Sequence, residues 1–182
     1  MKKGSAVLYV LRLAVTLLLI TAIVAALLSL VNGITAPIIA KMNEEKIQEA
    51  VRTVLPGGGD PVEFTDDTGL VTQVYQGENG YAVQVAPVGF DGEITMMVGI
   101  GPDGKVLGIS IINQTETAGL GAVCAAKNSA GQAFRDQFIG MSGTLAVEKD
   151  GGQVDAITSA TITSRAVTEG VNAALACVAR FG

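Results

Sequence analysis

A run of 19 uncharged residues near the start of the chain, Leu13–Val31, constrains its architecture more than any other feature. At about 1.5 Å per residue, an α-helix of this length extends roughly 28 Å, close to the thickness of the hydrocarbon core of a bilayer. A cleaved signal peptide is the alternative, but its apolar region spans about 7–15 residues and ends at a small-residue cleavage site. The segment Val31–Pro37 is a poor site of that kind. We therefore predict one transmembrane helix that anchors a larger domain.

The charges around this run predict its orientation. Lys2, Lys3 and Arg12 precede it, and the first acidic residue is Glu44. Because positively charged flanks stay in the cytoplasm, the rest of the chain should lie on the outer face of the cell (inner) membrane. Beyond residue 12 the chain carries 9 Lys and Arg against 17 Asp and Glu, a net charge of −8. That balance suits a soluble, acidic domain and disfavours nucleic acid as a partner.

The composition excludes several kinds of chemistry. His is absent, which removes the commonest general base and metal ligand. The 2 cysteines, Cys124 and Cys177, are too few for the roughly four ligands of an iron–sulfur cluster. With no Trp and 4% aromatic residues, stacking on nucleic acid bases is also disfavoured. We predict no catalytic side chain and no metal site, and we treat the cysteines as small buried residues, with a disulfide between them left open.

The periodicity of apolar residues beyond the anchor predicts an α+β domain. An amphipathic helix over 38–55 should end at Pro56–Gly59, and Gly77–Gly80 has the composition of a hairpin turn. We divide the chain into a membrane anchor (1–35), a linker helix (36–60) and a domain (61–182). Strands are expected over 71–75, 81–86, 94–100, 105–112 and 144–147, and helices over 131–138 and 163–180.

Gln114–Gly121 directly follows a predicted strand and is the first candidate site. Gly119 and Gly121 flank Leu120, which permits a backbone turn that most residues cannot adopt and lets a flat ligand approach the main chain. A strand-to-helix loop with a threonine cap is the alternative interpretation.

The hydroxyl-rich run Asp155–Ser164 is the second candidate site. Thr161 should lie just before the closing helix, where backbone N–H groups and the helix dipole favour an anion. The simpler interpretation is that Thr163 or Ser164 only caps this helix. A Walker-type phosphate loop is excluded because no GxxxxGK[ST] motif occurs, and a Ser-His-Asp triad is excluded because there is no His.

Taken together, the motifs resemble those of a known family. Asp155–Thr163 is similar to the flavinylation signature D-x-x-[ST]-[GS]-A-T-x-[ST] of FMN-binding domains, and Glu116–Gly121 is similar to their E-T-P-G-L-G motif. Gly89–Gly92 resembles their G-[YF]-x-G segment. The order of the motifs and the single anchor resemble the G subunits of the Rnf electron-transport complex. The related C subunit of the sodium-pumping NADH:quinone reductase is the near alternative.

This resemblance implies a covalent flavin. FMN would be joined through its phosphate to Thr161 as a phosphoester, made from FAD by a separate flavin transferase. Asp155 would serve recognition by the transferase or positioning of the hydroxyl, and the flavin ring would lie near Leu120. Ala118 replaces the usual Pro and Ser159 the commoner Gly, so a slightly freer loop is expected. The implied cofactor-binding residues are Asp155, Thr158, Ser159, Ala160, Thr161, Thr163, Ser164, Glu116, Thr117, Gly119, Leu120 and Gly121.

The resemblance also implies a function. The chain would be an electron-carrying subunit of an ion-translocating ferredoxin:NAD+ oxidoreductase, with membrane lipid and the other membrane and peripheral subunits of the complex as partners. A membrane-anchored module without flavin is an alternative of another class. Neither the coupling ion, sodium or proton, nor the flavin potential follows from these motifs.

Overall fold

The computed structural model describes residues 3–181, with side chains from residue 8 onward, so the flanking Lys2 lies outside the described residues. The chain divides into two compact units, residues 1–45 and 46–182. Helix α1 (Lys3–Val54) begins in the first unit and ends in the second.

The part of α1 in the first unit is suited to a lipid environment. All its described side chains are exposed, and it contains an 18-residue stretch with a mean hydropathy of 2.7. Among the described residues, α1 is thus a helix long and apolar enough to cross a membrane. The structure joins the apolar run and the predicted amphipathic helix into one helix with Pro37 inside it. Proline removes only one helical hydrogen-bond donor there, and the turns on both sides continue.

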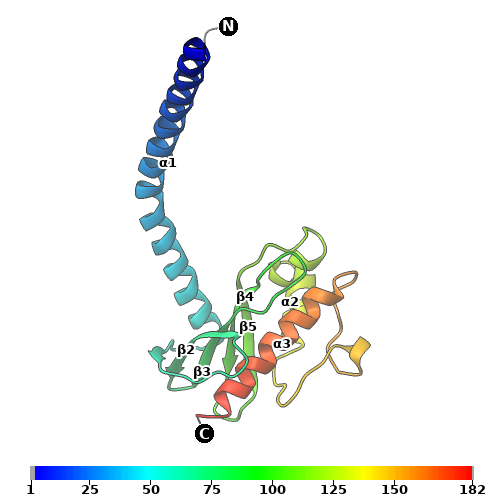
Figure 1. The fold of residues 1–182 in the computed structure, drawn as a ribbon. Helices are drawn as coiled ribbons and strands as arrows, with labels where there is room; N and C mark the ends of the chain where they lie inside the picture. Colours follow the sequence, from blue (N-terminus) through cyan, green and yellow to red (C-terminus); the bar gives the residue numbers. More distant parts are fainter. Residues whose placement is uncertain (1–2, 182) are drawn as a thin grey trace. The chain divides into compact units, whose positions relative to one another are not determined.

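The second unit is built on a five-stranded antiparallel sheet in the order β1-β2-β3-β4-β5 (Figure 1). The predicted hairpin is confirmed, since Gly77 pairs with Gly80 across the turn between β2 and β3. The remaining connections are also between sequence neighbours, so the sheet is a simple meander. The strands are β1 (Asp60–Val62), β2 (Val71–Gly77), β3 (Gly80–Val85), β4 (Thr95–Ile100) and β5 (Val106–Asn113).

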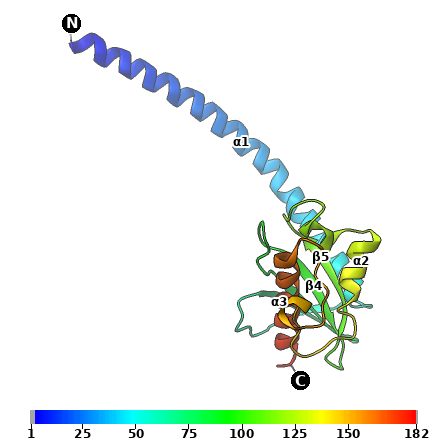
Figure 2. The ribbon, with the colours of Figure 1, turned by 90° about the vertical axis from the view of Figure 1, so that its right-hand side faces the viewer.

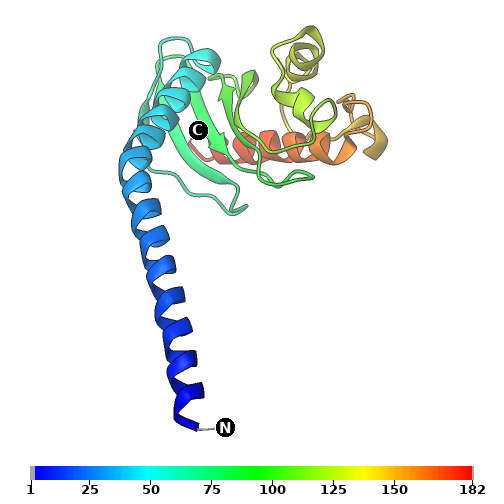
Figure 3. The same cartoon turned by 90° about the horizontal axis from the view of Figure 1, so that it is seen from above.

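Helices of the second unit cover both faces of this sheet. Alternate strand residues point to opposite faces, so Val98 joins the core under α3 (Thr161–Val178) while its neighbour Met97 packs with the last turns of α1. Figure 3 shows those turns and α3 on opposite sides of the strands. The larger core, on the α3 side, also includes the fully buried Phe138.

Three shorter helices complete the domain. The 3-10 helix η1 (Gly121–Ala125) and helix α2 (Ser129–Asp136) pack together beside β5, and the 3-10 helix η2 (Glu148–Asp150) precedes α3 (Figure 2). Helix α2 begins two residues earlier than predicted because the side chain of Asn128 caps it, accepting a hydrogen bond from the N–H of Gly131.

The predicted strand over 144–147 is wrong. Only Val147 forms a bridge, a single parallel pair with Val154. The segment lies beside α3 instead of along a sheet edge: Asn172 of α3 accepts a hydrogen bond from the N–H of Leu145 and donates one to its carbonyl, both at 2.8 Å. A side chain therefore takes the hydrogen bonds that a neighbouring strand would supply.

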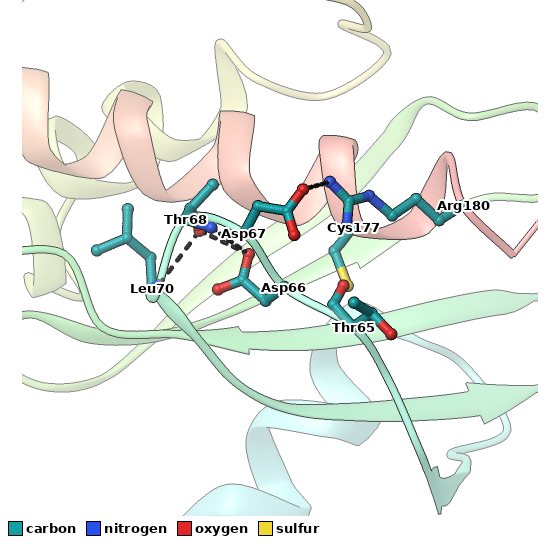
Figure 4. A network of polar contacts seen from close by, with 7 residues as sticks. All are labelled: Thr65, Asp66, Asp67, Thr68, Leu70, Cys177 and Arg180. Atoms are coloured by element: carbon teal, nitrogen blue, oxygen red, sulfur yellow. Dashed lines mark hydrogen bonds and ion pairs between the residues drawn. The ribbon is translucent and has the colours of Figure 1, made fainter.

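The segment that follows α3 contacts the loop between β1 and β2 (Figure 4). Arg180 forms an ion pair with Asp67, and this hydrogen bond lowers the pKa of the Asp67 carboxyl. The neighbouring Asp66 orders the same loop, because its carboxylate accepts hydrogen bonds from the N–H groups of Thr68 and Val71, both at 3.0 Å. The ion pair therefore joins the residues just after α3 to a loop that Asp66 orders.

The two cysteines are buried free thiols, so the disulfide left open by the sequence is absent. Burial raises the pKa of Cys124 to about 11, and the nearby Glu116 carboxylate adds to the shift. Burial also raises the pKa of Cys177.

Because the thiolate is the reactive form, we expect neither thiol to react measurably with iodoacetamide at about pH 8 in the folded protein, and both to react once it is unfolded in urea. Counting alkylated cysteines by intact mass checks this, and rapid labelling of the folded chain would contradict it.

Candidate flavin site

One buried carboxylate connects the motif segments predicted to form the site. Glu116, in the loop after β5, is only 6% exposed. Its Oε1 accepts a hydrogen bond from the N–H of Asp91 at 2.9 Å, and its Oε2 accepts one from the hydroxyl of Thr163. We call this arrangement of Glu116, Asp91 and Thr163 the Glu116 clamp. It brings the 89–92 loop, the 114–121 loop and the start of α3 together, so all three motifs meet at one place.

Further hydrogen bonds support the two loops that form the Glu116 clamp. The backbone N–H of Glu116 donates to the side chain of Gln114 at 2.6 Å, and the hydroxyl of Thr115 donates to the carbonyl of Asp91 at 3.0 Å. The 89–92 loop closes on itself through a hydrogen bond from the N–H of Gly89 to the carbonyl of Gly92 at 2.7 Å. Glu116 is therefore supported on both sides by local turns.

Two glycines provide the space for this carboxylate. A Cβ on Gly121 would lie 2.5 Å from both Glu116 Oε2 and Thr163 Oγ1, and a Cβ on Gly89 would clash with Glu116 Oε1. Gly121 thus allows the side chains of Glu116 and Thr163 to approach each other closely. From the sequence, we had expected this glycine only to let a ligand approach the main chain. Gly119 has open space around it and a φ of 77°, which fits the turn predicted there.

The start of α3 differs from the predicted cap. The helix begins at Thr161, and no side chain caps it at Ala160. The alternative interpretation, in which Thr163 or Ser164 only caps the helix, is wrong, because both lie inside the helix and are buried. Thr163 instead reaches Glu116, while the hydroxyl of Ser164 accepts from the N–H of Ile157 at 2.9 Å and donates to the carbonyl of Ala160 at 3.0 Å. The first N–H groups of α3 are consequently left without a side-chain acceptor, a feature of anion-binding helix ends.

Ser159 adopts a backbone conformation that the sequence did not predict. Its φ is 61°, in the left-handed region that favours glycine. Ser159 therefore holds a conformation that costs a non-glycine residue energy, at a position where Gly is commoner. The strained turn lies two residues before Thr161 and sets the direction from which the chain enters α3.

Thr161 lies at a cleft of about 300 Å³, within the usual size range of small-molecule sites. Three apolar side chains at the cleft remain solvent-exposed: Phe90 is 68%, Leu120 41% and Ile162 49% exposed. Apolar groups held in water beside an uncapped helix start suit a ligand with a flat ring and an anionic end. The lining residues are Phe90, Glu116, Thr117, Leu120, Gly121, Ser159, Ala160, Thr161, Ile162 and Thr163.

Four predicted site residues do not line this cleft. Ser164 supports the turn before α3 from within the core, and Thr158 and Gly119 are exposed nearby in the sequence. Asp155 is also exposed; its backbone N–H and carbonyl are hydrogen bonded by the side chain of Gln137, at 2.7 and 3.3 Å. Its carboxylate is thus on the surface, where another protein could contact it.

Sequence reasoning missed Lys149 as a site residue. Its ammonium donates a hydrogen bond to Thr161 Oγ1 at 2.9 Å. The cation comes from η2, a short helix that no sequence pattern predicted. Phe90 was noted only as part of a motif, and the structure places it on the cleft.

Comparison with known proteins gives the class of the domain that contains this cleft. The FMN-binding domain family matches residues 89–176, a range that contains the Glu116 clamp, Lys149 and Thr161. The residues present fit such a cofactor: an uncapped helix start and an ammonium for the phosphate, and apolar side chains for the ring.

Relatives over nearly the whole length give the particular family. The chain is 34% identical to the G subunit of the Na+-translocating ferredoxin:NAD+ oxidoreductase complex of Acetobacterium woodii, over 90% of this chain and 88% of that one. It is 33% identical to the G subunit of the ion-translocating oxidoreductase complex of Methanosarcina acetivorans, over 90% and 92%. It is 35% identical to the G subunit of the proton-translocating ferredoxin:NAD+ oxidoreductase complex of Clostridium ljungdahlii, over 85% and 84%. The chain belongs to this family of G subunits of ion-translocating oxidoreductase complexes.

Proposed function

We propose that this chain is the electron-transfer subunit of a membrane-bound, ion-translocating ferredoxin:NAD+ oxidoreductase and that it carries electrons on FMN. Bound flavin supplies the redox chemistry, and the protein supplies its position and electrostatic surroundings. The observation that carries the proposal is the Glu116 clamp, which gathers three distant segments around the cleft at Thr161. Of two relatives with similar identity to this chain, one is named as sodium-translocating and the other as proton-translocating, so the comparison does not determine the coupling ion.

We further propose that the FMN phosphate is esterified to Thr161. Among the hydroxyls of the motif that lie in α3, Thr163 and Ser164 are buried and engaged in hydrogen bonds within the protein, whereas Thr161 is half-buried at the cleft. A threonine hydroxyl is a weak nucleophile, and without any His in the chain an external flavin transferase is the reasonable source of activation. The exposed Asp155 is available for contact with that enzyme.

The proposed topology has three parts: an anchor (1–35), a linker helix (36–60) and a flavin domain (61–182). Lys3 and Arg12 precede the apolar run, and the first acid follows at Glu44, which supports an N-terminus in the cytoplasm and a domain on the outer face of the cell membrane. Attachment through a covalent bond is useful on that side, because a flavin that dissociated outside the cell would be lost. Lipid and the other subunits would surround the anchor.

The test uses membranes that contain the assembled complex, with either the natural chain or Thr161→Ala. We expect the substitution to reduce NAD+ reduction by reduced ferredoxin to background, while NADH:quinone reductase activity in the same membranes is unchanged. If NADH:quinone reduction were lost and the ferredoxin reaction retained, the chain would instead serve a quinone reductase. If both activities persisted, the electron-carrier proposal would fail and a module without flavin would remain.

A further inference from the structure

The loop over residues 147–154 is a compact turn next to the start of α3. The N–H groups of Asp150 and Gly152 both donate to the carbonyl of Val147, at 2.9 and 3.0 Å, and Val147 pairs with Val154 where the loop closes. In Figure 1 this yellow-to-orange loop lies beside the orange first turn of α3. Backbone hydrogen bonds within the loop fix its conformation, so the positions from which its side chains extend toward α3 are also fixed.

Two adjacent residues of this loop contact two residues of α3. The carboxylate of Asp150 accepts two hydrogen bonds from Arg165, Nε to Oδ2 at 2.7 Å and Nη2 to Oδ1 at 2.6 Å. Lys149 donates to Thr161 Oγ1 at 2.9 Å. Thr161 and Arg165 are four positions apart and thus lie on one face of the helix. The paired Asp150–Arg165 contact therefore keeps the loop where Lys149 reaches Thr161.

The direction of the Lys149 side chain is informative. The acidic residue that follows it, Asp150, is engaged by Arg165, and the ammonium of Lys149 is directed to a neutral hydroxyl. A hydroxyl oxygen has two lone pairs and one proton. Donation by Lys149 occupies one lone pair, which leaves the second lone pair and the proton available for reaction and restricts rotation of the hydroxyl.

We infer that Lys149 is a positioning residue for the attachment of FMN: it orients the Thr161 hydroxyl for transfer and then faces the negative charge of the phosphodiester formed on that oxygen. This inference rests on the proposed function. In the transfer, the Thr161 Oγ1–P bond forms and a P–O bond in the pyrophosphate of FAD breaks. AMP leaves, and the hydroxyl proton passes to a base on the transferase. No electrons change hands, so the step needs no oxidant or reductant.

The test measures incorporation of flavin into the full chain in detergent, with purified flavin transferase, FAD and Mg²⁺. Initial rates come from intact mass for the natural chain, Lys149→Met, Lys149→Arg and a control, Lys105→Ala, which changes an exposed lysine in the turn between β4 and β5. We expect Lys149→Met to be about 3- to 10-fold slower, since one charge-assisted hydrogen bond at an exposed position is lost. Lys149→Arg should stay within about twofold of the natural chain because it keeps the charge, and Lys105→Ala should match it.

A second measurement separates positioning from a general change in structure. In the completed adducts, the phosphorus-31 chemical shift of the phosphodiester should differ between Lys149→Met and the natural chain, whereas thermal melting should be the same. Equal incorporation rates and equal phosphorus shifts would overturn the role of Lys149 and leave the proposed function standing. Absence of any adduct in the natural chain would overturn the proposed function, and this inference with it.

Discussion

Thr161→Ala should abolish covalent flavin. When the chain is co-expressed with a flavin transferase and run on a denaturing gel, the natural protein should give a flavin-fluorescent band and Thr161→Ala a dark one. The reason is chemical: the substitution removes the hydroxyl oxygen at the cleft while leaving the start of α3 and the Glu116 clamp unchanged. Alanine is also a good helix former, so α3 should persist.

Two companion variants make this prediction specific. Thr161→Ser keeps a hydroxyl at the same position and should still become fluorescent. Thr72→Ala removes an exposed hydroxyl on β2, outside the run, and its band should be as bright as that of the natural chain. A fluorescent Thr161→Ala band would show that FMN is attached elsewhere and would contradict the site described above.

Glu116→Ala should cause a large loss of stability. It leaves the buried hydroxyl of Thr163 and the part-buried N–H of Asp91 without their acceptor. A buried polar group left unpaired costs about 1–3 kcal/mol, and water can replace the acceptor of the part-buried N–H, so we expect the free energy of unfolding to fall by about 1–3 kcal/mol. That is a large part of the roughly 5–15 kcal/mol by which a domain is stable. Urea unfolding of the full chain in detergent, followed by near-ultraviolet circular dichroism, measures the loss.

A second variant disrupts the same arrangement without removing a charge. Gly121→Ala places a Cβ 2.5 Å from both Glu116 Oε2 and Thr163 Oγ1, so the two side chains must separate. We expect it to destabilise the domain and to slow flavin incorporation together. As a matched control, Glu148→Ala changes an exposed glutamate and should alter stability by less than about 0.5 kcal/mol. If Glu116→Ala unfolded at the same urea concentration as the natural chain, the clamp would not be the support of the site.

Local patterns predicted most of the domain correctly. The hairpin at Gly77–Gly80 was predictable because its signal lies within a few residues, and the apolar stripe from Val167 to Val178 was predictable because it repeats with the helical period. The strand over 144–147 was wrong because its partner is a side chain of α3, Asn172, which no local pattern reveals.

The candidate site was predictable in its composition but only partly in its geometry. The hydroxyl-rich run allowed a helix cap at Thr163 or Ser164, since capping is a local signal. The actual partner of Thr163 is Glu116, 47 positions away, and this contact exists only after the sheet and α3 have packed together. Lys149 escaped notice for a similar reason, because it lies 12 positions before Thr161 in a loop without a recognisable motif.

The most direct test of the central claim is a peptide map of the natural chain after maturation with a flavin transferase. Fragmentation by mass spectrometry can assign the adduct to one hydroxyl among the five of the run 158–164. We predict that FMN is found on Thr161 alone. An adduct on Thr158 or Ser159, or an unmodified run in a chain exposed to an active transferase, would contradict the account.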